Sequence, residues 1–271
     1  MTTVADLLRA GGLARADTLA LLAHLLGSGR EQLVAHPQRP VDERCAQAFA
    51  ALAARRRAGE PLAYLLASRE FYGRRFAVSP AVLIPRPETE LLVELGLELI
   101  AARSEPAVLE LGAGCGCVAI TLALQRPAAR VTAVERSPEA LALARANAQA
   151  LGATLHWIES DWFARVDGAF DLIVANPPYV RAGDPHLAEL AFEPAAALVA
   201  GADGLDDLRR IVAGAGAHLR AGGWLAVEHG YDQAGEVAAL IAAAGFESIA
   251  CRRDLQGHAR VTCGRKGAAA G

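Results

Sequence analysis

The most informative stretch of this chain for its fold is Leu109-Glu-Leu-Gly-Ala-Gly-Cys-Gly-Cys117. An apolar run ends here, three alternate glycines follow, and a helical pattern begins. Glycines let the backbone turn tightly and approach a ligand closely, while a helix N-terminus favours negative charge. The turn therefore predicts a nucleotide-type ligand, although dinucleotide oxidoreductases use the same device.

The spacing of the glycines separates these ligands. The pattern is G-x-G-x-G, not the G-x-G-x-x-G of dinucleotide-binding turns. Glu110 precedes the first glycine, where it would repel a pyrophosphate but can receive the ammonium group of an amino-acid-like ligand. Together, these features indicate S-adenosylmethionine.

Strand and helix patterns alternate around this turn. The alternation predicts an open, mostly parallel α/β sheet with helices on both faces. The last two strands are close in sequence, so we expect them to pair as an antiparallel hairpin at one edge. The predicted strands are 107–111, 130–134, 154–158, 170–175, 224–228, 248–252 and 260–263, and the predicted helices include 88–102, 118–125, 138–151, 204–219 and 232–244.

The first seventy residues show helical spacing only. Asp17 and Ser28 stand where helix N-caps are expected. Near residue 69 the period changes, and aromatic residues around Gly73 predict a short β-hairpin. We therefore predict a helical domain over 1–69, a β-hairpin linker over 70–84 and an α/β domain over 85–271.

Composition narrows the class of protein. The chain has 271 residues, 53% of them hydrophobic, which allows two domains with a real core. Its net charge of −3 disfavours a protein that mainly grips a phosphate backbone. The five cysteines are scattered and odd in number, which fits a reducing compartment. Neither a targeting segment nor an apolar run of roughly 20 residues stands out, so we expect a cytoplasmic protein with no membrane contact.

Two further sites follow the next strands. Glu135 ends the second strand of the α/β domain, where a carboxylate can accept hydrogen bonds from both ribose hydroxyls. Asp161 and Trp162 follow the third strand. Trp162 offers a flat apolar face for adenine and Asp161 can accept a hydrogen bond from its amine, although a tryptophan packed in the core is an open alternative.

The segment Asn176-Pro-Pro-Tyr179 indicates the reaction. Two prolines fix a rigid loop that lacks backbone donors at those positions. The carbonyls of Asn176 and Pro177 can then accept both hydrogens of a planar NH₂ group, against which Tyr179 can pack. This arrangement suits an amide or aromatic amine and aims its nitrogen at a sulfonium methyl, so that catalysis comes mainly from orientation and electrostatics.

The sequence gives little indication of a metal site or of catalytic histidines. Cys115 and Cys117 lack a second ligand pair, so we expect no metal site. His229 and His258 are interpreted as structural residues. A nicotinamide oxidoreductase and a catalytically silent binding module remain the alternatives from other classes.

The quoted motifs resemble the HemK/PrmC family, which are peptide chain release factor glutamine methyltransferases. The resemblance rests on 109–116, Glu135, 176–179 and above all Val82-Leu-Ile-Pro-Arg-Pro-Glu-Thr-Glu90. It extends over nearly the whole chain, including Glu193-Pro and the tail 254–260. The loop at 176–179 is shared with nucleic-acid amine methyltransferases, whereas the proline-flanked Arg86 is more specific.

The resemblance implies a class I S-adenosylmethionine-dependent methyltransferase fold, Rossmann-like, with a mostly parallel seven-stranded sheet. It implies methyl transfer to the glutamine of the GGQ motif in class 1 release factors, which yields S-adenosylhomocysteine, and a role for residues 1–69 in recognising that protein. The alternative is an amine methyltransferase acting on a nucleobase. The implied cofactor residues are Glu110, Gly112, Ala113, Gly114, Cys115, Gly116, Glu135, Asp161, Trp162 and Asn176, and the implied catalytic residues are Asn176, Pro177, Pro178 and Tyr179.

The chain departs from the family pattern at a few positions. Glu110 and Glu135 replace the commoner aspartates, and Ala113 and Cys115 stand where hydroxyl residues are frequent. We expect these departures to affect cofactor affinity rather than the chemistry.

Overall fold

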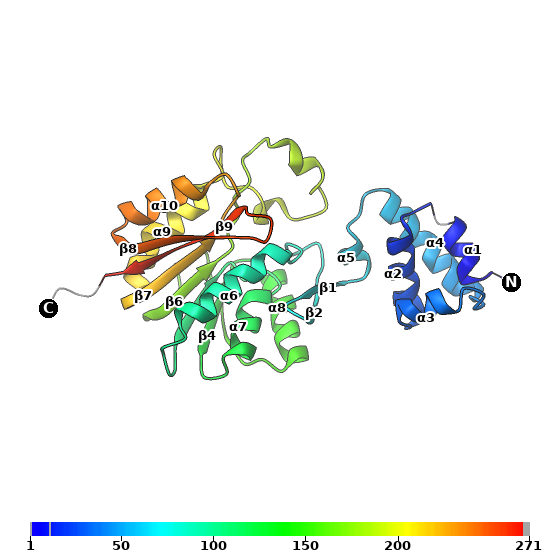
Figure 1. The fold of residues 1–271 in the computed structure, drawn as a ribbon, viewed down its shortest axis with the longest axis horizontal. Coiled ribbons are helices and arrows are strands. Elements are labelled where there is room, and N and C mark those ends of the chain that lie inside the picture. The colour runs from blue at the N-terminus through cyan, green and yellow to red at the C-terminus, as the bar shows by residue number, and fades with distance from the viewer. Residues whose placement is uncertain (1, 11, 268–271) are drawn as a thin grey trace. The chain divides into compact units, whose positions relative to one another are not determined.

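The computed structural model describes residues 2–10 and 12–267 and divides into two compact units, one ending at Arg69 and the other beginning at Glu70. The ends of the predicted domains, residues 1 and 268–271, lie outside the described residues, as does residue 11. Figure 1 shows helices alone in the first unit up to the hairpin, and a sheet flanked by helices in the second.

The N-terminal unit contains the predicted helices. Buried leucines and Phe49 from these helices make its core, and Asp42 caps the fourth helix by accepting a hydrogen bond from the Cys45 backbone N–H at 2.7 Å. The helices are α1 (Val4–Ala10), α2 (Arg15–Leu26), α3 (Arg30–Ala35), α4 (Glu43–Arg57) and α5 (Leu62–Leu65).

Two predicted N-caps in this unit are wrong. Ala14 and Gly29 occupy the N-cap positions of α2 and α3. Asp17 instead lies in the first turn of α2, where its carboxylate pairs with Arg56 at 2.8 Å. The Ser28 hydroxyl receives a hydrogen bond from Arg39. An acid in the first turn still complements the helix dipole, which is why the sequence signal falls near the helix start but not on its cap.

The predicted hairpin is present and starts two residues before the predicted linker. It consists of β1 (Ser68–Phe71) and β2 (Arg74–Ala77). Tyr72 and Gly73 join the strands with φ angles of 51° and 70°. Positive φ at both central positions is the geometry of a tight two-residue hairpin turn.

The second unit is built on the predicted seven-stranded sheet. The order is β5-β4-β3-β6-β7-β9-β8, with β5 to β7 side by side in parallel and β9 and β8 antiparallel at one edge, as predicted. The strands are β3 (Ala107–Leu111), β4 (Arg130–Glu135), β5 (His156–Glu159), β6 (Phe170–Ala175), β7 (Leu219–Glu228), β8 (Phe246–Arg253) and β9 (Ala259–Lys266).

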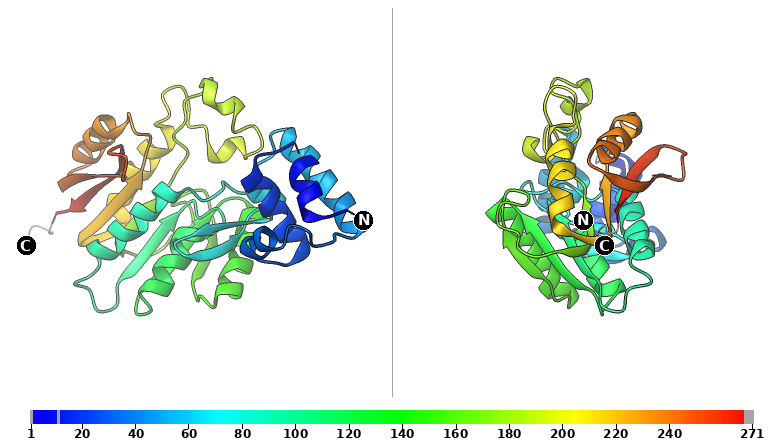
Figure 2. Two further views of the ribbon diagram at one scale, coloured as in Figure 1. Left: turned by 45° about the vertical axis from the view of Figure 1, so that its right-hand side comes forward. Right: turned by 90° about the vertical axis from the view of Figure 1, so that its left-hand side faces the viewer.

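Helices cover both faces of this sheet (Figure 1, Figure 2). Successive side chains of a strand point to opposite faces of the sheet. On β6, Leu172 and Val174 lie against α6 at Gly96, whereas Ile173 packs with α9 and α10 on the other face. The helices are α6 (Glu90–Leu99), α7 (Cys117–Gln125), α8 (Pro138–Leu151), α9 (Asp206–His218) and α10 (Ala234–Ala243), with 3₁₀ turns η1 (Pro87–Thr89), η2 (Pro185–Ala188) and η3 (Ala195–Ala197).

Three strands begin earlier than predicted, β8 and β9 by one or two residues and β7 by five. β7 starts at Leu219, immediately after α9, whereas the sequence predicted a strand only from residue 224. The pair Gly222-Gly223 lies inside the strand, next to a register shift against β6. A Cβ on Gly223 would come within 3.0 to 3.2 Å of three carbonyl oxygens, so glycine is what permits this close approach.

The strand order reverses between β3 and β6. Two strands, β4 and β5, extend from β3 in one direction, and β6 and β7 extend in the other. Ligands of open α/β sheets bind outside the carboxyl ends of the strands at such a switch point. The glycine turn follows β3 and Asn176 follows β6, so both predicted motifs lie at this point. Among the described residues, no helix has the length and apolar character needed to cross a bilayer.

Candidate active site

The glycine turn adopts a backbone that requires its glycines. Gly112, Gly114 and Gly116 have φ angles of 73°, 55° and 84°. A Cβ on Gly112 would lie 3.1 Å from the Trp162 ring, and one on Gly116 would lie 2.9 Å from Ile120. Both the φ angles and the lack of space therefore favour glycine at positions 112 and 116, where the turn runs close to the Trp162 ring and then enters α7.

Glu110 is buried at the end of β3 with 3% of its surface exposed. Its Oε2 accepts a hydrogen bond from the Ala119 backbone N–H at 2.8 Å, in the first turn of α7. Burial raises the pKa of Glu110 well above its usual value, and the neighbouring Cys115 and Glu135 act in the same direction. An ammonium group beside this carboxyl would favour its ionised form and be held by it.

Glu135 ties the glycine turn to the end of β4. Its Oε2 accepts a hydrogen bond from Gly114 N–H at 2.8 Å, and its Oε1 accepts two more from Arg136 N–H and Ser137 N–H at 2.8 and 2.9 Å. An ionised carboxylate has about four acceptor sites, so three bonds orient the group and still leave capacity for a hydroxyl.

Asp161 and Trp162 follow β5. Trp162 has a positive φ of 46°, and its indole N–H donates to Asp207 at 3.1 Å. This bond and the contact with Gly112 hold the ring over the glycine turn. Asp161 is half-exposed and pairs with Arg210 at 2.6 Å, so its carboxylate is already engaged on the protein surface.

Asn176 begins the loop after β6. Its Nδ2 donates to the Thr89 hydroxyl at 3.2 Å. Its Oδ1 is buried and has no hydrogen-bond partner among the described residues. An unpaired buried acceptor is unfavourable unless something else supplies a donor, so this atom marks a position for an N–H group from a ligand.

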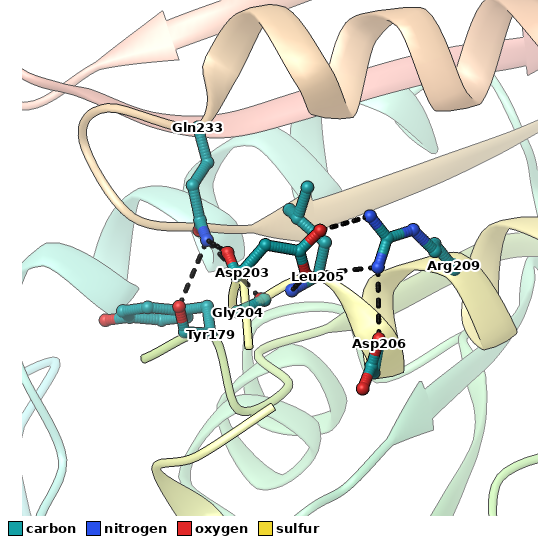
Figure 3. A network of polar contacts seen from close by, with 7 residues as sticks. All are labelled: Tyr179, Asp203, Gly204, Leu205, Asp206, Arg209 and Gln233. Carbon is teal, nitrogen blue, oxygen red and sulfur yellow. Dashed lines mark hydrogen bonds and ion pairs between the residues drawn. The ribbon is translucent and has the colours of Figure 1, made fainter. Parts of the chain in front are cut away.

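The far end of the loop is anchored by a polar network (Figure 3). Gln233, at the start of α10, donates from Nε2 to the Tyr179 carbonyl at 3.1 Å. Gly204 packs so closely on that carbonyl that a Cβ would lie 2.2 Å from it. Arg209 pairs with both Asp203 and Asp206 and fixes the adjoining turn. Tyr179 itself is half-buried, and burial raises the pKa of its phenol above the usual value.

Most of the predicted residues surround one cavity of about 400 Å³. Of the predicted residues, Gly116, Pro177 and Tyr179 do not line it: Gly116 packs against α7 and α8, and the two loop residues lie beside it. The predicted residues that line the cavity are Glu110, Gly112, Ala113, Gly114, Cys115, Glu135, Asp161, Trp162, Asn176 and Pro178.

Two further segments, around residues 81–86 and 194–197, complete the wall of the cavity. They are linked by Glu193, which is buried, pairs with the Arg86 guanidinium and accepts a hydrogen bond from Ile84 N–H at 3.0 Å. Arg136 adds a bond to the Ala196 carbonyl at 3.2 Å. The proline-flanked arginine therefore holds one wall segment against the other.

The cavity fits the ligand predicted from the sequence. Acidic groups stand at the glycine turn and at the end of β4, where a cation and a pair of hydroxyls would lie. An aromatic ring covers the turn, and an unpaired acceptor stands at the end of β6. Cys115 and Cys117 also border the cavity, and the described part of the chain contains no cluster of three metal-ligating side chains.

Sequence reasoning missed several residues that shape this site. Thr89 and Gln233 hold the loop at Asn176 and Tyr179, and Glu228 lies buried beside them at the end of β7. The available signal for Glu228 was an acid at the end of an apolar strand, the same signal that predicted Glu135. His229, interpreted as structural, is buried and bonded to Thr262 and the Gly230 carbonyl.

Comparison with known proteins identifies the family. A family described as "Methyltransferase small domain" matches residues 88–203, and one described as "PrmC N-terminal domain" matches residues 2–66. The release factor glutamine methyltransferase of Burkholderia pseudomallei is 49% identical, covering 97% of this chain and 96% of the relative. The protein of the same name from Pseudomonas aeruginosa is 48% identical, over 98% and 99%.

The chain belongs to the release factor glutamine methyltransferase family. The resemblance drawn from the motifs is thereby confirmed.

Solved structures confirm the predicted class I methyltransferase fold. A methyltransferase from Pyrococcus furiosus matches with a TM-score of 0.58 at 20% identity, covering 79% of this chain and 99% of that one. A 16S rRNA methyltransferase from T. thermophilus matches with a TM-score of 0.53 at 22% identity, covering 73% of this chain and 49% of that one. At these identities the likeness concerns the fold alone.

Proposed function

We propose that this family member transfers the methyl group of S-adenosylmethionine to the side-chain amide nitrogen of a glutamine, the one in the GGQ motif of class 1 peptide chain release factors. Family membership supports the activity and the substrate. The observation in this chain that carries the proposal is the unpaired Oδ1 of Asn176 beside the cavity. It offers an acceptor for an N–H of the incoming amide.

The chain contributes mainly orientation. An amide nitrogen is a poor nucleophile because its lone pair is delocalised, so its alignment with the reacting methyl decides the rate. Asn176 and the Pro177 carbonyl would hold its two hydrogens, and Tyr179 would pack against its plane. The prolines keep this loop rigid, and Gln233 and Gly204 fix its far end.

The cofactor, when bound, supplies an electrophilic methyl on a sulfonium. Glu110 and the glycine turn would hold its amino-acid end, Glu135 its ribose hydroxyls, and Trp162 its adenine. The paired Asp161 would contribute only at the rim, since Arg210 already engages it. The acidic lining also suits a ligand with positive charge.

We further propose that the N-terminal helical domain recognises the release factor and that the enzyme acts in the cytoplasm, where translation terminates. The match of residues 2–66 to an N-terminal domain named for this family supports a conserved module, distinct from the general methyltransferase part.

The test uses labelled S-adenosylmethionine with three acceptors: purified class 1 release factor, the same factor with the GGQ glutamine replaced by glutamate, and total RNA. We expect label only in the first. Label in RNA and none in the release factor would contradict the proposal and favour a nucleobase methyltransferase using the same loop.

A further inference from the structure

The amide of Asn176 must point in one of two directions. Its oxygen and nitrogen ends have nearly the same shape, but only the oxygen accepts the hydrogens of a substrate NH₂ group. With the amide turned over, the nitrogen would face the substrate and two donors would oppose each other. Something outside the loop must therefore select the productive orientation.

Two buried side chains stand behind this amide. Thr89, 3% exposed, ends the 3₁₀ turn that follows Arg86, and its hydroxyl accepts a hydrogen bond from Asn176 Nδ2 at 3.2 Å. Glu228, 1% exposed, ends β7, and both Thr89 and Asn176 stand close enough to its carboxyl group to lower its pKa by hydrogen bonding. Its Oε2 is buried and has no hydrogen-bond partner among the described residues. The Asn176 amide thus has an acceptor hydroxyl and a carboxylate on its nitrogen side.

The chemistry of these groups gives the network a direction. The Thr89 oxygen accepts from Asn176, which leaves the hydroxyl proton free to point towards Glu228. An ionised carboxylate only accepts hydrogen bonds, so this direction suits both groups. If the amide were reversed, its oxygen would face the carboxylate, and two acceptors in a buried site repel each other. The charge on Glu228 therefore fixes which end of Asn176 is free.

We propose that Thr89 and Glu228 are positioning residues that hold the Asn176 amide with its oxygen towards the substrate nitrogen. The proposal rests on the proposed function and deepens it. It also gives the Thr89 of the proline-flanked arginine motif a specific role, which the sequence pattern alone did not provide.

The surroundings of Glu228 make the network sensitive to pH. Burial raises the pKa of Glu228 to about 7, and Glu88 on η1 acts in the same direction. The Thr89 and Asn176 hydrogen bonds and Arg260 on β9 oppose the rise, and the Tyr179 phenol lies nearby as a neutral group. Below this pH the protonated acid can donate, and the amide loses its preferred orientation.

The experiment compares Thr89→Val, Thr89→Ser and Glu228→Gln in the full-length enzyme with release factor as substrate. We measure kcat, KM for the release factor and the dissociation constant of S-adenosylmethionine from about pH 6 to pH 9. Thr89→Val removes the hydroxyl at nearly constant volume, and we expect a roughly tenfold loss of kcat with cofactor affinity unchanged. Thr89→Ser keeps a hydroxyl and should restore most of that loss.

Glu228→Gln gives an independent readout. Wild-type kcat should fall as the pH drops through about 7, whereas in Glu228→Gln the lower kcat should no longer show that midpoint. Cofactor binding at wild-type affinity shows that each variant is folded.

Wild-type kcat in Thr89→Val, or the wild-type midpoint kept in Glu228→Gln, would overturn the positioning role. Failure of the proposed function looks different, because the wild-type enzyme itself would then leave the release factor unmethylated.

Discussion

The buried carboxyl group of Glu228 keeps its proton to a higher pH in the folded protein than in the unfolded chain. Its carboxyl is 1% exposed, and burial raises its pKa from 4.5 to about 7. Between these values the folded state keeps a proton that the unfolded state has lost. The stabilising contribution is therefore complete below about pH 4.5 and is lost as the pH rises through about 7.

The size of this effect follows from the shift. A difference of about 2.5 pKa units corresponds to about 3 kcal/mol of unfolding free energy. Glu228→Gln removes the titration, so the stability difference between variant and wild type should change by about 3 kcal/mol in favour of the variant between about pH 4.5 and pH 8.

Tryptophan fluorescence is the appropriate assay. All three tryptophans, Trp157, Trp162 and Trp224, belong to the α/β unit, so urea unfolding followed at this signal reports on the unit that contains Glu228. Glu105→Gln, at an exposed acid, serves as the matched control and should show a difference from wild type that does not depend on pH. A pH-independent difference for Glu228→Gln as well would show that the pKa of buried Glu228 is not raised.

Three further predictions concern the cavity. Asn176→Ala should lower kcat at least a hundredfold while cofactor affinity, measured by calorimetry, stays within about threefold, since a positioning contact is lost. Arg86→Met should leave buried Glu193 without its ion pair, which weakens cofactor binding and lowers the melting temperature. A variant with the cofactor affinity and the melting temperature of the wild type would argue against the link between the wall segments. Gly116→Ala should abolish cofactor binding because of its φ of 84° and its clash with Ile120, whereas Gly114→Ala, with φ of 55° and open space, should retain a folded protein in circular dichroism.

The parts of the site that follow strand ends could be predicted from the sequence. The glycine turn, Glu135 and Asn176 each lie where an apolar strand stops, and the carboxyl ends of parallel strands meet at one edge of the sheet. Local pattern was therefore enough to bring these residues to one cavity.

The supporting contacts could not be predicted, because they join residues far apart in the chain. Thr89 and Asn176 are separated by 87 positions, Tyr179 and Gln233 by 54, and Arg86 and Glu193 by 107. No local periodicity encodes such pairs.

The errors have local causes too. The predicted strand at 224–228 left out the glycines that precede it, yet Gly223 permits a close approach to the neighbouring strand and β7 extends back to Leu219. Asp17 resembles a cap, yet it forms an ion pair one turn further on. In both cases a tertiary contact decided between two conformations that the sequence allows equally.

The proposed activity of this enzyme is methylation of the side-chain amide nitrogen of one glutamine in a release factor. Mass spectrometry of the GGQ-containing peptide, after incubation of unmethylated release factor with enzyme and S-adenosylmethionine, tests it most directly. We expect a gain of one methyl group, located by fragmentation on the glutamine side chain and absent with Asn176→Ala. An unmodified glutamine, or a methyl group on another residue of the peptide, would contradict it.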